Sequence, residues 1–186
     1  MTISSNLRST TKDYLEQNYH TYNQPCYVHP DPLEVVLPYG EDLGDREILA
    51  FIASSLALGR APAIVHAAEE VVRRLFSVHS TKDGMHPSIG IRDTLLGLSD
   101  AELEELFHGF VYRFFRCEHL VMLLRALRRM VEERGNLESF FISSTGNGTA
   151  EVGTLSPKKR NFGLCSVLQG FTREIRNRTD GDPGIL

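Results

Sequence analysis

Hydrophobic residues recur along most of this chain with the spacing of an α-helix. The clearest unit covers residues 44–76, where two apolar stripes are separated by a short break. Asp45 is a suitable N-cap for the first helix, Gly59 is well placed to end it, and Pro62 suits the start of the second. The first stripe contains Ile48, Leu49, Ile52, Ser55 and Leu56, and the second contains Ile64, Val65, Ala68, Val71, Val72, Leu75 and Phe76. The pattern predicts two helices that meet at a tight corner.

Other segments follow the same period. Residues 11–22 place one side of a helix at Tyr14, Leu15, Asn18, Tyr19 and Tyr22. Ser99 and Glu102 have the spacing of a capping box, so a helix is expected after them. A longer helix is predicted over residues 117–135, and a last one over 161–177.

No segment shows the alternation typical of a strand, and the predicted fold class is therefore all-α. We expect a single irregular helical bundle of about six to eight helices, forming one domain over residues 1–186. Ser, Thr and Gly are frequent near residues 143–160, which predicts a flexible loop, and residues 178–186 are expected to form a frayed tail.

Residues 107–116 read FHGFVYRFFR. This stretch, rich in aromatic residues and arginine, suits either a surface that binds nucleic acid or a corner where two helices meet. Phe107, Phe110 and Phe114 stand at i, i+3 and i+7, which is the spacing of a helical core rather than of a base-stacking platform. Gly109 allows the chain to leave one helix, and a turn at Tyr112 and Arg113 then precedes the next. The stretch is predicted to be a packed corner between two helices.

Composition narrows the function classes. The 186 residues are 41% hydrophobic and carry a formal net charge of −4, so no global basic field indicates nucleic-acid binding. Three widely separated cysteines argue against a disulfide framework and against structural zinc. Because the chain begins with a polar segment and has no long apolar run, we expect a cytoplasmic protein with no membrane partner.

The chain lacks the strong catalytic and phosphate-binding signatures. Its histidines are scattered, so neither a metal site nor a cofactor is expected. Four acids at 41–47 form a run that is explained more simply by stabilisation of a helix N-terminus than by a metal site. No catalytic residue is assigned.

Two basic groups are candidates for phosphate contact. On the helical wheel, Arg125, Arg128 and Arg129 lie opposite the apolar face and are expected to be exposed together. Lys158, Lys159 and Arg160 form the second group. These positioned cations suit a phosphate backbone, although charge alone favours a solvated amphipathic face.

Three stretches resemble a known family: HPDPLEVVLPY at 29–39, EILAFIASSLALGR at 47–60 and GFVYRF at 109–114. The chain is similar over residues 14–141 to the uncharacterised bacterial proteins known as domain of unknown function 2400. The matching residues with an expected structural role are Gly59, Arg60, Gly109, Phe110, Tyr112, Arg113 and Phe114.

That family is in turn distantly similar to the helix-hairpin-helix DNA glycosylases, and this similarity is one of architecture. The glycosylases carry their DNA-gripping hairpin and catalytic aspartate further toward the C-terminus, and neither matches a residue here. The resemblance therefore implies the N-terminal portion of a longer family member, without a catalytic group of its own.

Two functional hypotheses follow. The first is a nucleic-acid-associated helical protein that binds weakly and without sequence specificity. The second is a protein-interaction or self-association module, in which apolar residues of the last helix are exposed: Phe162, Val167, Leu168 and Phe171. An intact enzyme is the least favoured of the interpretations.

Overall fold

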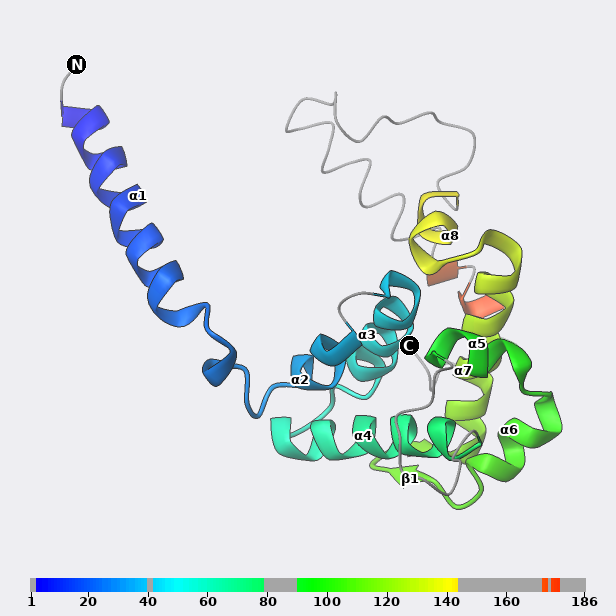
Figure 1. The fold of residues 1–186 in the computed structure, drawn as a ribbon. Helices are drawn as coiled ribbons and strands as arrows, with labels where there is room; N and C mark the ends of the chain where they lie inside the picture. The colour runs from blue at the N-terminus through cyan, green and yellow to red at the C-terminus, as the bar shows by residue number, and fades with distance from the viewer. Residues whose placement is uncertain (1–2, 40–41, 79–89, 144–171, 174, 178–186) are drawn as a thin grey trace.

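The computed structural model describes residues 3–39, 42–78, 90–143, 172–173 and 175–177 (Figure 1). Within these ranges the elements are α1 (Ile3–Tyr22), η1 (Pro25–Tyr27), α2 (Leu33–Val36), η2 (Leu37–Tyr39), α3 (Leu43–Ser55), α4 (Ala61–Ser77), α5 (Ile91–Gly97), α6 (Asp100–Leu106), β1 (Val111–Tyr112), β2 (Phe115–Arg116), α7 (Cys117–Arg134) and α8 (Leu137–Ser143). The all-α prediction is confirmed, with one small hairpin that the sequence pattern did not predict. Apart from Ser143, which ends α8, the expected loop at 143–160 and the tail at 178–186 lie outside the described residues.

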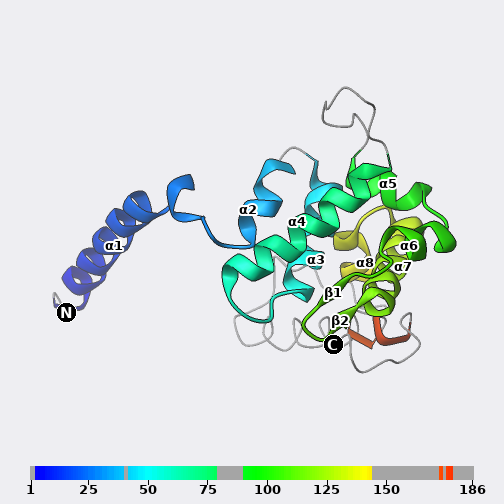
Figure 2. The same cartoon turned by 90° about the horizontal axis from the view of Figure 1, so that it is seen from below.

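Helix α1 extends away from the other helices in both views (Figures 1 and 2). The helix predicted at 11–22 is confirmed, since α1 covers these residues and begins earlier, at Ile3. Its apolar stripe is not part of the core, since the most exposed members are Tyr14, Leu15, Tyr19 and Tyr22, at 59–65%.

The core lies among α2, α3, α4, α5, α6, α7 and α8. Most members of the apolar stripes predicted at 44–76 are buried, and Leu56 and Val71 have no exposed surface. Ser55, Val72 and Phe76 are partly buried. In α7 the predicted face is buried throughout, at Leu120, Leu123, Leu124, Leu127, Met130 and Val131. The capping box at Ser99 and Glu102 begins α6 as expected. Ile175 is 2% exposed and joins the same apolar cluster.

Helix α3 begins three residues earlier than the sequence pattern suggests. Asp42, not Asp45, is the N-cap, because its Oδ1 accepts a hydrogen bond from the Asp45 amide at 3.1 Å. The side chain of Asp45 is thereby free to reach α5, where its Oδ1 accepts from the Arg92 amide at 2.7 Å. Asp45 is 5% exposed, so a carboxylate inside the fold satisfies the first turn of another helix.

Gly90 makes this contact sterically feasible. A Cβ atom on Gly90 would lie 2.4 Å from Oδ2 of Asp45, which no side chain tolerates without a shift. Glu47 reaches a third helix, where its Oε2 accepts from the Leu137 amide at the start of α8, at 3.0 Å. The acidic run at 41–47 therefore includes carboxylates that stabilise the starts of three different helices.

Replacing Asp45 by Ala should lower the free energy of unfolding by about 2 kcal/mol, because the Arg92 amide would lose its partner inside the protein. Urea unfolding followed by circular dichroism measures this change. Asp93→Ala is the matched control, since that side chain is 65% exposed and its ion pair with Arg92 spans 3.6 Å. The control should change stability by less than about 0.5 kcal/mol. Equal effects of the two substitutions would contradict the capping role of Asp45.

Candidate functional site

A short hairpin connects α6 to α7. Its base is fixed by Arg74 of α4, whose Nη1 donates to the carbonyl oxygens of Leu106 and His108, each at 3.1 Å. The guanidinium of Arg74 also lies over the ring of Phe110, 5.9 Å from its centroid. Gly109 has a φ of +72° and turns the chain out of the helical segment.

The two strands of the hairpin present different faces. Tyr112 pairs with Phe115, and both side chains pack against the core. Val111 pairs with Arg116, and both are exposed. The alternation of a strand thus separates an inner aromatic pair from an outer apolar and basic pair.

The tip of the hairpin consists of Arg113 and Phe114. Arg113 has a φ of +53°, in the left-handed region that tight hairpin turns require and that non-glycine residues seldom adopt. Phe114 is 79% exposed, so its predicted place in a packed corner is wrong. Phe107 and Phe110 are buried as predicted, at 0% and 4% exposure. The i+7 spacing fails for Phe114 because α6 ends at Leu106 and the chain is extended beyond Phe110.

The hairpin packs on the turn between α3 and α4. The hydroxyl group of Tyr112 donates to the carbonyl oxygen of Leu58 at 3.0 Å. Gly59 has a φ of +129°, and a Cβ atom there would lie 2.5 Å from Nε of Arg113. The guanidinium of Arg113 therefore lies directly against the backbone at Gly59. Two of the stretches that carry the family resemblance, ALGR and GFVYRF, meet at this contact.

We call the exposed residues around this contact the hairpin surface: Leu58, Arg60, Val111, Arg113, Phe114 and Arg116. Its apolar members are 51%, 69% and 79% exposed at Leu58, Val111 and Phe114. Among the described residues, no carboxylate forms an ion pair with any of its three guanidinium groups. The surface thus combines an apolar tip with three exposed arginines.

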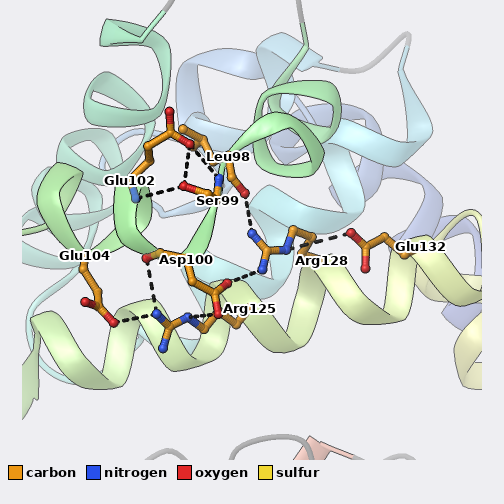
Figure 3. A network of polar contacts seen from close by, with 8 residues as sticks. All are labelled: Leu98, Ser99, Asp100, Glu102, Glu104, Arg125, Arg128 and Glu132. Atoms are coloured by element: carbon orange, nitrogen blue, oxygen red, sulfur yellow. Dashed lines mark hydrogen bonds and ion pairs between the residues drawn. The ribbon is translucent and has the colours of Figure 1, made fainter.

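The arginines of α7 are arranged differently (Figure 3). Arg125 donates to Glu104 at 2.6 Å and to the Asp100 carbonyl at 3.2 Å. Arg128 donates to the carboxylate of Asp100 and to the carbonyl of Leu98, just after α5. Hydrogen bonds from Arg128, and the charges of nearby arginines, lower the pKa of Asp100 although desolvation opposes the shift.

The expectation that Arg125, Arg128 and Arg129 are exposed together is wrong for two of them. The side chains of Arg125 and Arg128 are only 25% and 13% exposed, because α6 packs beside α7 and presents the carboxylates of Asp100 and Glu104 to them. Arg129 is exposed. The second basic group, Lys158, Lys159 and Arg160, lies outside the described residues.

Within the described residues, no group of three or more His, Cys, Asp or Glu side chains is arranged to hold a metal ion. In the same part of the chain, no helix combines the length and apolar character that a membrane span requires.

The chain belongs to the family described as Protein of unknown function (DUF2400), whose sequence profile matches residues 31–180. The match includes both stretches of the hairpin surface and begins after α1. It starts later and ends later than the resemblance expected at 14–141. Neither the curated proteins nor the solved structures gave a significant match.

Gly59→Ala should destabilise the protein by about 1–3 kcal/mol, because the new Cβ requires a strained φ and displaces the Arg113 guanidinium. Thermal and urea unfolding measure this effect. Gly97→Ala provides the matched control, since a Cβ there meets nothing within 4 Å. If Gly59→Ala were as harmless as Gly97→Ala, the close contact between the hairpin and the α3–α4 turn would be refuted.

Asp100→Asn should make stability less dependent on pH in acid. The pKa of Asp100 in the folded protein is lowered from its ordinary value of 3.8, so its contribution is complete above that value. The contribution is lost as the pH falls through the lower folded pKa, and the Asn variant has nothing to lose there. Urea midpoints between pH 6 and pH 3 test this difference.

The same substitution in an Arg128→Gln background is the control, because this background lacks the largest cause of the shift. Asp100→Asn should then alter the pH dependence much less. Equal effects of Asp100→Asn in both backgrounds would show that Arg128 does not set the titration of this carboxyl.

Proposed function

We propose that this protein associates with nucleic acid through the hairpin surface. The observation that carries the proposal is the set of three exposed arginines, Arg60, Arg113 and Arg116, around the exposed ring of Phe114. Arginine binds phosphate oxygens through a planar fork of donors, and contacts of this kind supply most of non-specific affinity. The proposal assigns no catalytic step to the chain.

The charge of the whole chain limits what this surface does. A net charge of −4 gives no long-range attraction for a polyanion, so binding depends on local cations. With about three phosphate contacts, the complex is weak and strongly salt-dependent. The proposed location of the protein is the cytoplasm. The proposed association with nucleic acid is consistent with the distant similarity to DNA glycosylases inferred from sequence.

The arginines of α7 have a smaller part in this proposal. A phosphate at Arg125 or Arg128 would compete with carboxylates of α6 that already accept their hydrogen bonds. Arg129 is an additional exposed contact, and Lys158, Lys159 and Arg160 remain the predicted auxiliary group. The proposal thus moves the main site from the long helix to the hairpin that precedes it.

A protein-interaction or self-association module is the alternative. It is favoured by the apolar stripe on α1, where Tyr14 and Leu15 are 65% and 60% exposed. Such a stripe on a helix that extends from the body suits association with a partner chain. The residues first predicted to drive association, Phe162, Val167, Leu168 and Phe171, lie outside the described residues.

Fluorescence anisotropy with a short labelled DNA duplex tests the proposed function. With three phosphate contacts, affinity should fall roughly 40-fold between 50 mM and 200 mM salt. The double variant Arg60→Gln/Arg116→Gln should weaken binding at low salt and reduce the salt dependence to about fourfold. Arg129→Gln measured alongside reports whether α7 adds a contact.

Arg73→Gln is the matched control, because Arg73 is exposed but forms an ion pair with Glu70 at 2.7 Å. It should leave both the affinity and the salt slope close to those of the parent protein. Absence of binding at about 50 mM salt would contradict the proposal. Under that outcome, a mass by light scattering above the 20.9 kDa of one chain would favour the alternative.

A further inference from the structure

We propose that Phe114 is a wedge that enters a DNA duplex at a step where base stacking is already interrupted, such as a bulge or a mismatch. This inference rests on the proposed function, because the arginines of the hairpin surface must first hold the phosphates. It adds a substrate class, interrupted duplex DNA, and a distinct role for one aromatic side chain.

The position of Phe114 is unusual for a large apolar residue. Its side chain is 79% exposed at the end of a two-residue turn, and no other exposed member of the hairpin surface is aromatic. An aromatic ring in water loses the favourable transfer that burial would provide. A ligand that covers the ring would recover this free energy.

The hairpin is supported so that its tip is held outward. The hydroxyl group of Tyr112 is hydrogen-bonded to the carbonyl oxygen of Leu58, and the guanidinium of Arg113 lies against Gly59. At the base of the hairpin, Arg74 donates hydrogen bonds to two backbone carbonyl groups. A supported side chain needs little further ordering on binding, which lowers the entropic cost of insertion.

A single projecting ring favours a wedge over a stacking platform. Platforms for single strands present several aromatic rings to successive bases. In this hairpin the other two aromatics, Tyr112 and Phe115, pack against the core and are not available. Apolar wedges instead insert one side chain between adjacent base pairs and bend the duplex.

The neighbours of Phe114 fit this mode. Arg113 is adjacent in sequence, Arg116 lies on the outer face of β2, and Val111 beside it is 69% exposed. An apolar tip flanked by cations can enter the base stack while the cations contact phosphates. A continuous duplex must be unstacked before the ring can enter, whereas a bulge or mismatch has lost much of that stacking already.

The test compares the full chain on three labelled DNAs at about 50 mM salt: a continuous duplex, the same duplex with a one-nucleotide bulge, and the single strand. We expect the bulged duplex to bind about tenfold tighter than the continuous one, equivalent to about 1.4 kcal/mol. Phe114→Ala should abolish this preference and keep the salt dependence, while Phe114→Leu should retain part of it. Tyr27→Ala, which removes an aromatic ring that is 59% exposed on η1, is the matched control and should keep the preference.

A second readout follows the base stack itself. With 2-aminopurine beside the bulge, the parent protein should change the fluorescence on binding, and Phe114→Ala should not. Equal binding to both duplexes, unchanged by Phe114→Ala, would overturn the wedge and leave the proposed function standing. Tightest binding to the single strand would also overturn it. No binding to any of the three DNAs would reject the proposed function together with the wedge.

Discussion

The buried hydrogen bond from the Arg92 amide to Asp45 shows the constraint on which this fold depends. A helix leaves its first amides and last carbonyls without partners, and these groups need other partners when helix ends meet inside a protein. Helices α5, α6 and α8 have seven residues each, too few to be stable alone. Their ends are bonded by charged side chains of the longer helices α3, α4 and α7.

In each of these hydrogen bonds, a charged side chain of a long helix pairs with a backbone group at the end of a short one. Asp45 and Glu47 of α3 accept from the first turns of α5 and α8, respectively. Arg128 of α7 donates to the carbonyl after α5, and Arg74 of α4 donates to the carbonyl that ends α6. Much of the charge that looks like a surface property in the sequence therefore serves helix ends. The arginines of the hairpin surface are candidates for function because, among the described residues, they form no ion pair with a carboxylate.

The limits of sequence interpretation follow from the same constraint. Local patterns were sufficient for the all-α class, the apolar faces of α3, α4 and α7, and the capping box of α6, since each depends on residues within a few positions. They failed for Asp45 and Arg128, whose partners are 47 and 30 residues away. Phe114 was misplaced because helical spacing was continued across Gly109 into an extended segment. The meeting of the ALGR and GFVYRF stretches is likewise a contact between distant segments that no local pattern encodes.

The contact between Gly59 and Arg113 also couples the substitutions that two distant positions can accept. The volume that a side chain at 59 would occupy is filled by the guanidinium from 113, and both residues have positive φ angles. A change at either position therefore alters what the other can tolerate. Family members that differ at one of these positions should differ at the other as well, so the two should covary although more than fifty residues of chain separate them.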